Sequence, residues 1–257
     1  MLYEELLAFS QSRLLSFFEN STLFEGQFDF TEFNQICYEK MYENNSYDNL
    51  LTVKQFKEEY PELKDLCKKC AAFYIPARNK SIPKYDVILG KQHEEILMEF
   101  LSGILDVDIA RGDLQNRKYP DCKLIDKSGN AIAYFEVKFH GAPFVYALNK
   151  TGRYCYEGSA TLDYKKIEKQ LEIIHSEIDC PVFYLHWIDY PCLKGVFFET
   201  AQQVEEYITE QHEDFEREAR EGDLEKGSES RYTKKMYSPL LKMGSFEEFV
   251  EVLKGLI

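Results

Sequence analysis

Apolar side chains repeat with two different periods along the chain, and the change between them falls near residue 90. In the first part, leucines recur at helical spacing, as at Leu2, Leu6 and Leu7, which predicts helices. In the second part, short apolar runs alternate with amphipathic segments, which is typical of strands and helices that build one sheet-based core. We therefore predict an α/β protein with an N-terminal helical domain.

The second part of the chain carries strand and helix signals in a regular order. Two helices have clear start signals, because Thr200 with Gln203 and Ser245 with Glu248 have the spacing of capping boxes. The predicted strands cover residues 120–125, 131–140, 182–188 and 195–199, and the predicted helices cover residues 91–105 and 162–176, a segment that begins at Thr200, and residues 246–256.

The strands over residues 120–125 and 131–140 flank a turn cluster, which predicts a β-hairpin. A turn centred between Ser128 and Gly129 places Asp121 opposite Glu136. Opposed residues on neighbouring strands have Cβ atoms about 4.5–5.5 Å apart. Two carboxylates at that separation can share one divalent cation.

The second strand of this hairpin has one polar and one apolar face. Glu136 and Lys138 alternate with Phe135 and Val137, whose side chains have the composition of a core. Two acids and a lysine beside an apolar sheet are costly unless a metal or a substrate uses them. The alternative is an exposed cross-strand ion pair, which would contribute little to stability.

A Pro-Asp pair that ends at Asp121, followed by the triplet from Glu136 to Lys138, resembles the PD-(D/E)xK nuclease superfamily. The order of the predicted helices and strands extends this resemblance over residues 88–212. It implies a restriction-endonuclease-like core, in which helices flank a central mixed sheet.

The resemblance and the composition together predict three regions. Pro76 and Pro83 bracket a polar stretch typical of a linker, so we expect the helical domain over residues 1–85. The nuclease-like core is expected over residues 86–212. Residues 213–257 are expected to form an acidic loop and a C-terminal helix that packs on the core.

The resemblance also implies a catalytic and metal-binding set. Asp121, Glu136 and the carbonyl of Val137 would hold Mg²⁺, for which Mn²⁺ can substitute. The ion would lower the pKa of a bound water and neutralise charge on the phosphate. Lys138 would position or deprotonate that water, or stabilise the charged phosphate.

Members of this superfamily often add an acid from the first core helix and a polar residue from the helix after the Glu-Xaa-Lys strand. Glu94 is the candidate metal ligand, because it shares a helical face with apolar residues such as Leu97. Glu95 lies on the expected solvent face and is the second choice. Gln170 is the candidate for catalytic support.

The net charge of -14 argues against a basic footprint for nucleic acid over the whole surface. A local basic rim near Asp121 and in the expected loop over residues 149–164 would compensate. An ordinary polar loop explains the same residues equally well. The candidates for nucleic-acid contacts are Arg117, Lys118, Lys150, Arg153, Lys165 and Lys166.

Other features of the sequence predict a cytoplasmic protein with reduced thiols. The longest apolar run, residues 182–188, is too short to cross a bilayer, and the first residues lack a signal-peptide pattern. Seven scattered cysteines do not suggest a disulfide scaffold. Cys67 and Cys70 could be half of a zinc site, but no second pair follows them, so a core position is the default.

We therefore expect a Mg²⁺-dependent endonuclease that hydrolyses phosphodiester bonds in DNA, of restriction or anti-phage type. Cleavage of both strands of a duplex calls for two sites, hence a homodimer. A protein partner that supplies positive charge is a further expectation. The alternatives are a non-catalytic subunit with the nuclease fold and an acidic interaction protein that mimics nucleic acid.

Overall fold

The computed structural model describes most of the chain beyond residue 82 and one segment before it. The described residues are 2–20, 83–116, 118–140, 159–189, 194–210, 216–218 and 232–257. Within these ranges, no helix is long and apolar enough to cross a membrane.

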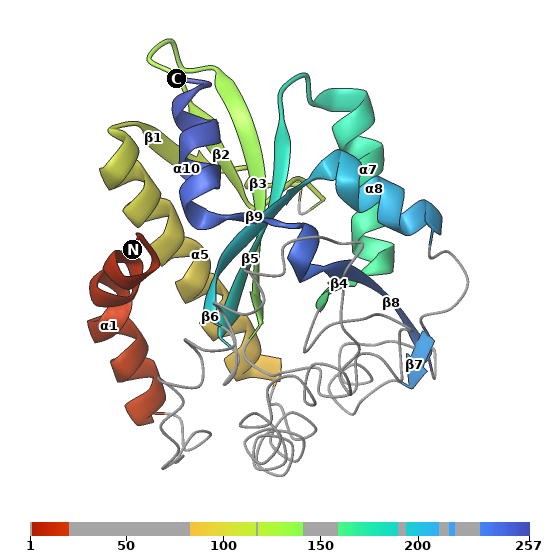
Figure 1. Ribbon diagram of the computed structural model, residues 1–257, viewed down its shortest axis with the longest axis horizontal. Helices are drawn as coiled ribbons and strands as arrows, with labels where there is room; N and C mark the ends of the chain where they lie inside the picture. The colour runs from red at the N-terminus through yellow and green to blue at the C-terminus, as the bar shows by residue number, and fades with distance from the viewer. Residues whose placement is uncertain are drawn as a thin grey trace.

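The centre of the fold is a six-stranded, mostly antiparallel sheet (Figure 1). The pairing of β3 with β5 is parallel, and every other pair of neighbours is antiparallel. In the order of the sheet, the strands are β1 Asp108–Arg111, β2 Cys122–Ile125, β3 Ala131–His140, β5 Val182–Asp189, β6 Lys194–Thr200 and β9 Gly244–Ser245.

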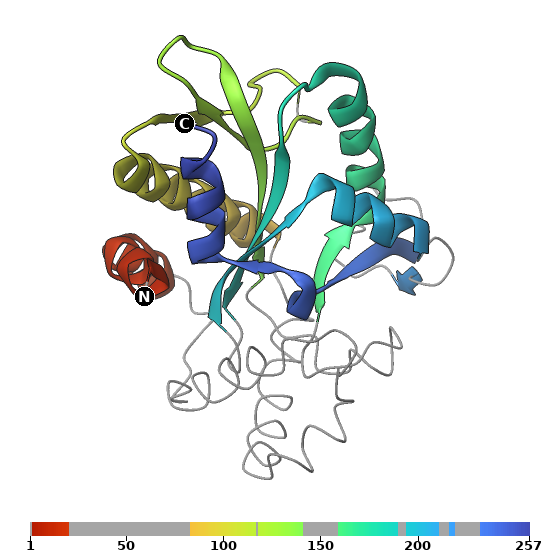
Figure 2. The same ribbon diagram turned by 45° about the horizontal axis from the view of Figure 1, so that its top comes forward.

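Helices cover both faces of this sheet (Figures 1 and 2). On one face lie α5 Pro83–Leu105 and α10 Phe246–Lys254, and α1 Leu2–Asn20 packs against both of them. On the other face lie α7 Tyr164–Glu177 and α8 Ala201–Glu210. The structure is thus a mixed α/β fold with a helix-flanked central sheet, as expected.

A second, three-stranded sheet lies beside α7 and α8, in the order β4 Ser159–Asp163, β8 Tyr232–Pro239 and β7 Glu216–Glu218. A short 3₁₀ segment, η3 Leu240–Lys242, follows β8. The prediction for residues 213–257 is therefore wrong in part, because this region also contributes strands to both sheets. The expected loop over residues 149–164 is wrong at its end, which forms β4.

Side-chain alternation along the strands divides the interior into two apolar clusters. Phe183 and Leu185 of β5 join the cluster under α5 and α10, whereas Tyr184 joins the cluster under α7 and α8. The amphipathic helices supply the other half of each cluster, with Leu97 from α5 and Ile167 from α7 fully buried. Burial of these faces explains why short helices with moderate propensity form here.

The two capping boxes are present at the starts of α8 and α10. The Gln203 side chain accepts from the Thr200 N–H at 2.8 Å, and Ser245 and Glu248 satisfy each other in the same way. These contacts pair backbone donors that the first helical turn would otherwise leave free. Both predicted helix starts are therefore confirmed.

Gly112, just after β1, packs closely against the backbone of Pro120 and Asp121, just before β2. Its N–H donates to the carbonyl of Asp121 at 2.9 Å, and a Cβ at this position would lie 1.9 Å from the carbonyl oxygen of Pro120. Backbone cannot give way as a flexible side chain can. A side chain at position 112 would therefore push Asp121 away from β1.

We predict that Gly112→Ala lowers the free energy of unfolding by about 1–3 kcal/mol, because overpacking at this contact forces the backbone apart. Urea denaturation gives the measurement. Gly103→Ala is the matched control, since nothing beyond its own stretch of helix lies within 4 Å of its Cβ position and alanine favours the helix by about 0.5–1 kcal/mol. Equal stability of Gly112→Ala and the wild type would contradict this role of Gly112.

Candidate active site

The β2–β3 hairpin brings Asp121 and Glu136 together in the predicted register. Cys122 pairs with Phe135, so Asp121, which comes just before β2, stands opposite Glu136. The N–H of Val137 donates to Oδ2 of Asp121 at 3.0 Å, which ties the carboxylate to the strand that carries Glu136. A local turn and a short hairpin are enough to produce this arrangement, which is why the sequence could predict it.

Glu136 is fully buried, and both of its carboxylate oxygens accept hydrogen bonds. The ammonium groups of Lys138 and Lys166 donate to Oε1. Gln170, also fully buried, donates from Nε2 to Oε2 at 2.9 Å. A buried carboxylate is tolerated only when it is paired and hydrogen-bonded, and this set of donors meets that condition.

The two lysines determine the charge of Glu136. Burial alone would raise the pKa of its carboxyl, but the charges of Lys138 and Lys166 outweigh burial and lower this pKa to about 2. The pKa of Lys138 is raised in turn, because the attraction of Glu136 and Asp121 outweighs the effect of burial. Both groups are therefore charged at neutral pH.

The pKa of Asp121 is raised, whereas that of Glu136 in the same cluster is lowered. Burial and the negative charge of Glu136 raise its pKa to about 7, and Lys138 and Lys166 offset only part of this increase. Two adjacent carboxylates resist carrying two charges at once. Asp121 is therefore only partly ionised near neutral pH, and a cation bound by the pair would displace its remaining proton.

The carboxylate oxygens of this cluster are ligands that suit a hard divalent cation. Asp121 and Glu136 offer carboxylate oxygens, and Mg²⁺ commonly binds one or two carboxylates and keeps several waters. Within the described ranges, no three His, Cys, Asp or Glu side chains are grouped so as to hold one ion. Any ion here would thus rely on two carboxylates, water and backbone oxygen.

Glu94 points inward from α5 and Glu95 points outward, as the helical pattern predicts. The Glu94 side chain is 19% exposed and forms an ion pair with Arg111 of β1, whereas Glu95 is 56% exposed and lies 3.4 Å from the same guanidinium. The charge of Glu94 also raises the pKa of Asp121, although less than burial and Glu136 do. Glu94 is nevertheless held by Arg111 and is not grouped with Asp121 and Glu136.

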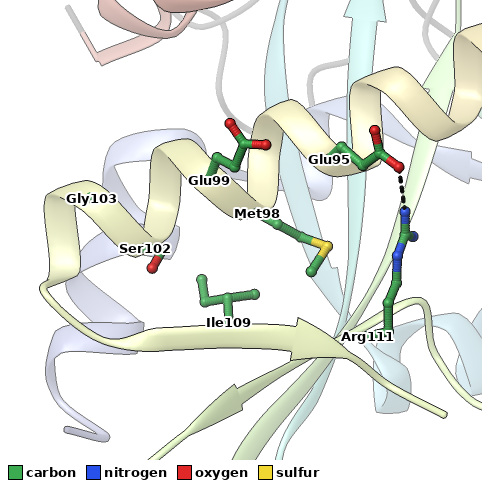
Figure 3. A pocket seen from close by; sticks show the side chains of 7 residues that line it. All are labelled: Glu95, Met98, Glu99, Ser102, Gly103, Ile109 and Arg111. Atoms are coloured by element: carbon green, nitrogen blue, oxygen red, sulfur yellow. Dashed lines mark hydrogen bonds and ion pairs between the residues drawn. The ribbon is translucent and has the colours of Figure 1, made fainter. Parts of the chain in front are cut away.

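A shallow hollow of about 440 Å³ lies between α5 and β1, beside the Glu94–Arg111 pair (Figure 3). Met98 and Ile109 form its floor, and Arg111 reaches across one end toward Glu95 (Figure 3). Asp121 and Glu136 do not line it. The cluster of Asp121, Glu136 and Lys138 therefore lies outside this hollow.

The structure adds buried polar residues that sequence reasoning missed. His186 and Glu199 are fully buried, and Nε2 of His186 lies 2.8 Å from Oε1 of Glu199. Nε2 of His140 lies 3.0 Å from Nδ1 of His186. Tyr184 stands between Glu136 and Glu199 in the sheet register, and its hydroxyl is buried without a hydrogen-bond partner.

The structure places the candidates for nucleic-acid contacts in different surroundings. Lys118 and Lys165 are exposed, whereas Lys166 is engaged with Glu136. Their role toward nucleic acid stays a prediction. The candidates that lie outside the described residues are Arg117, Lys150 and Arg153, and the Cys67–Cys70 pair also lies there.

Comparison with known proteins assigns no family to this chain. No protein-family model and no curated protein matches it. Among solved structures, a nuclease from a fusselovirus is similar to this chain, with 14% sequence identity and a TM-score of 0.36. The matched region covers 66% of this chain and 89% of the viral nuclease. A similarity of this size carries no argument about function, so the proposal below depends on the geometry of the site.

The raised pKa of Asp121 predicts a measurable dependence of stability on pH. The folded state holds a proton on Asp121 up to a pH of about 7, whereas the unfolded chain releases it near the ordinary value of 3.8. Stability from this group is therefore lost as the pH rises between these values. We predict that Asp121→Asn, which removes the charge, stabilises the protein on the order of 1–4 kcal/mol more at pH 8 than at pH 5.

Urea denaturation without added metal at the two pH values measures this difference. Asp126→Asn in the β2–β3 turn is the control, because hydrogen bonds lower the pKa of that carboxyl. It should lose stability at both pH values. A stabilisation by Asp121→Asn that is the same at pH 5 and pH 8 would contradict the raised pKa.

Proposed function

We propose that this protein is a metal-dependent nuclease that hydrolyses phosphodiester bonds, with DNA as the substrate. The observation that carries the proposal is the fully buried Glu136 opposite Asp121, with Lys138 on the same face of β3. Charged groups gathered in this way, with carboxyl pKa values of about 2 and about 7, are a recognised mark of a functional site.

A purely structural role explains this cluster poorly. Apolar residues of similar volume at buried positions are often as stabilising as a buried ion pair, or more so. Burial and the repulsion of the adjacent Glu136 carboxylate both raise the pKa of Asp121, so the cluster opposes its own full ionisation. The cluster is therefore better understood as prepared for a positively charged ligand.

In the proposed mechanism, Asp121, Glu136 and the carbonyl of Val137 would hold Mg²⁺ or Mn²⁺. The bound ion would supply a water of lowered pKa and neutralise charge on the phosphate. Glu94 is a further candidate ligand, provided that it leaves Arg111. Gln170 keeps the Glu136 carboxylate in a fixed orientation through its hydrogen bond to Oε2.

Lys138 acts as a cation in this mechanism and not as a base. Its pKa is raised by Glu136 and Asp121, so its ammonium group retains its proton at neutral pH. A permanently charged donor stabilises negative charge on a phosphate oxygen in the transition state. Lys166, which donates to the same oxygen of Glu136, provides a second positive charge at the site.

A duplex substrate, a homodimer and a restriction or anti-phage role complete the proposal. Two sites are needed to cut both strands, which a pair of identical chains would provide. The net charge of -14 makes weak binding at physiological salt an expected property. A protein partner with positive charge would compensate for it.

A non-catalytic subunit is the second candidate, and one observation favours it. Both oxygens of Glu136 already accept hydrogen bonds, so a cation has to compete with two ammonium groups. The two candidates differ in whether metal binds and whether cleavage follows.

We predict metal-dependent cleavage that depends on Glu136. Purified protein is incubated with supercoiled plasmid, linear phage DNA or structured RNA, in Mg²⁺, Mn²⁺ or EDTA. Glu136→Gln keeps the shape of the side chain but removes its charge, and cleavage should fall by at least about 100-fold. Lys127→Ala, an exposed change in the turn of the same hairpin, is the control and should cleave at the wild-type rate.

Discrete DNA fragments from the wild type would support the restriction-type assignment, and a smear would indicate non-specific cleavage. Cleavage that survives Glu136→Gln, or that is unaffected by EDTA, would refute the proposed site. No cleavage of any substrate by the wild type would favour the non-catalytic candidate.

Lys166 gives a second prediction, because it competes with a cation for Oε1 of Glu136. Lys166→Gln removes that competing charge, so Mn²⁺ should bind about three- to ten-fold more tightly by calorimetry. Cleavage should become slower at saturating metal, since the second positive charge is lost. Lys165→Gln, the exposed neighbour on α7, tests whether any change of lysine on this helix alters metal affinity. Weaker Mn²⁺ binding by Lys166→Gln would show that Lys166 supports the ion instead.

A further inference from the structure

The loop that joins β1 to β2 leads into Asp121, and contacts near both of its ends tie it to the rest of the fold. At its start, the N–H of Gly112 donates to the carbonyl of Asp121 at 2.9 Å. Near its end, the ring of Tyr119 packs against Tyr134 of β3, with 6.1 Å between the ring centroids. The Tyr119 hydroxyl donates to Oε2 of Glu177 on α7.

These contacts place the loop beside the carboxylate cluster. Side chains two residues apart on a strand share a face, so Tyr134 lies on the face of β3 that carries Glu136. Helix α7, which holds the other end of the Tyr119 side chain, also contacts Glu136 through Lys166 and Gln170. The loop therefore forms part of the rim of the proposed active site.

Hydrogen bonds within the loop fix the backbone around Leu114. Oδ1 of Asp113 accepts from the N–H groups of Gln115 and Asn116, at 2.7 and 2.6 Å. The side chain of Asn116 accepts in turn from the N–H of Lys118 at 3.1 Å. Leu114 lies inside this turn, so little further ordering of its backbone is needed when its side chain makes a contact.

The side chain of Leu114 is 88% exposed, which is the largest value among the exposed large apolar residues of the described ranges. The others are 37–55% exposed, and all of them belong to α1, α5 or α10 or follow α10, on the opposite face of the sheet: Leu7, Phe9, Val87, Ile88, Val252 and Ile257.

Exposure alone assigns nothing, because single apolar side chains are common on protein surfaces. Leu114 differs in two respects, which are its hydrogen-bonded backbone and its place beside Asp121. Both properties are those of a side chain that is presented to whatever occupies the site.

The chain length between Leu114 and Asp121 limits the reach of this side chain. Leu114 follows Gly112 by two residues, so their Cα atoms are at most about 7 Å apart. Residues joined as Gly112 and Asp121 are have Cα atoms roughly 5.5 Å apart, which places Leu114 within about 13 Å of Asp121. Each strand of B-DNA advances about 3.4 Å per nucleotide, so this distance corresponds to about four base pairs.

The neighbours of Leu114 favour nucleic acid over protein as its partner. A protein interface needs a cluster of apolar residues at its centre, but the exposed neighbours Gln115 and Lys118 are polar and basic. An apolar wedge between base pairs needs only one side chain. The carboxylate of Asp113, which a phosphate would repel, already accepts two backbone N–H groups.

We propose that Leu114 inserts as an apolar wedge between two stacked base pairs of duplex DNA, within about four base pairs of the scissile phosphate. The wedge favours a pyrimidine–purine step at that position, because such steps unstack more easily than the steps of a stiff A-tract. The position relative to a scissile phosphate rests on the proposed nuclease function, whereas the insertion requires only that the protein binds DNA.

Duplexes that carry 2-aminopurine at successive positions test the insertion, because this base fluoresces more strongly when it is unstacked. With the wild type in EDTA at low salt, fluorescence should rise at one step of the duplex. Leu114→Ala should abolish the rise and raise the Kd, measured by anisotropy, about ten-fold. Ile257→Ala is the matched control, because it removes the same number of carbon atoms from an exposed side chain beyond α10 and should change neither value.

Two further variants separate insertion from a general effect on the loop. Leu114→Met keeps an apolar side chain of similar size and should retain the fluorescence rise. Leu114→Asn has nearly the shape of leucine but carries an amide, and it should lose the rise. The wild type should also bind a duplex with a TA step at the responding position about three- to ten-fold more tightly than one with an AA step, and Leu114→Ala should bind both equally.

A wild type that binds DNA without any fluorescence rise would overturn the wedge, as would a Leu114→Ala protein with the fluorescence and Kd of the wild type. A Leu114→Ala protein that changes its sedimentation from dimer to monomer while the fluorescence rise persists would assign Leu114 to a contact between chains instead. The absence of any duplex binding by the wild type would also overturn the wedge.

The failure of the wedge and the failure of the proposed function give different results. Cleavage that depends on Mg²⁺ and Glu136, without insertion, would leave the nuclease in place and remove the wedge. Insertion without cleavage in any metal would remove the nuclease and leave Leu114 as a DNA contact. When both occur, the mapped cleavage position should lie within about four base pairs of the responding step.

Discussion

The burial of Glu136 is the constraint on which the rest of the site depends. A carboxylate with no solvent exposure needs compensation from its own protein, and here it receives two ammonium groups and one amide. To meet that requirement, Lys138 has to lie on the same face of β3 as Glu136. Helix α7 has to lie over that face and be rotated so that Lys166 and Gln170 point toward the sheet. The acidic and basic residues of the site are thus one electrostatic unit.

Asp121 completes this unit, so that two carboxyl groups stand together with the two ammonium groups of Lys138 and Lys166. Lys138 and Lys166 keep Glu136 ionised, but they do not suffice to ionise Asp121 fully at neutral pH. Under the proposed function, a bound cation would replace the proton that burial and Glu136 favour on Asp121.

The sequence predicted the hairpin and the meeting of Asp121 with Glu136 because the signals are local. Asp121 and Glu136 lie within one short turn-connected segment, and alternation along β3 separates core from site. Resemblance to a nuclease superfamily added Gln170, which indeed contacts Glu136.

The sequence did not predict contacts between residues on strands that are far apart in the chain. The parallel register of β3 with β5 brings His186 opposite Lys138, and no turn or spacing in the sequence encodes that register. Glu199 occupies the end of a strand, where an acid normally contacts water, and its burial depends on how α8 packs on β5 and β6. Strands β7 and β8 were missed because charged residues obscure their alternation.

The most direct test of the account is a crystal structure of the protein soaked with Mn²⁺, with the ion located by anomalous scattering. The account predicts one ion between the carboxylates of Asp121 and Glu136, with at least one of the two lysines displaced from Oε1 of Glu136. An unoccupied site at saturating Mn²⁺, with Lys138 and Lys166 still bound to Glu136, would contradict the claim that this cluster is prepared for a metal.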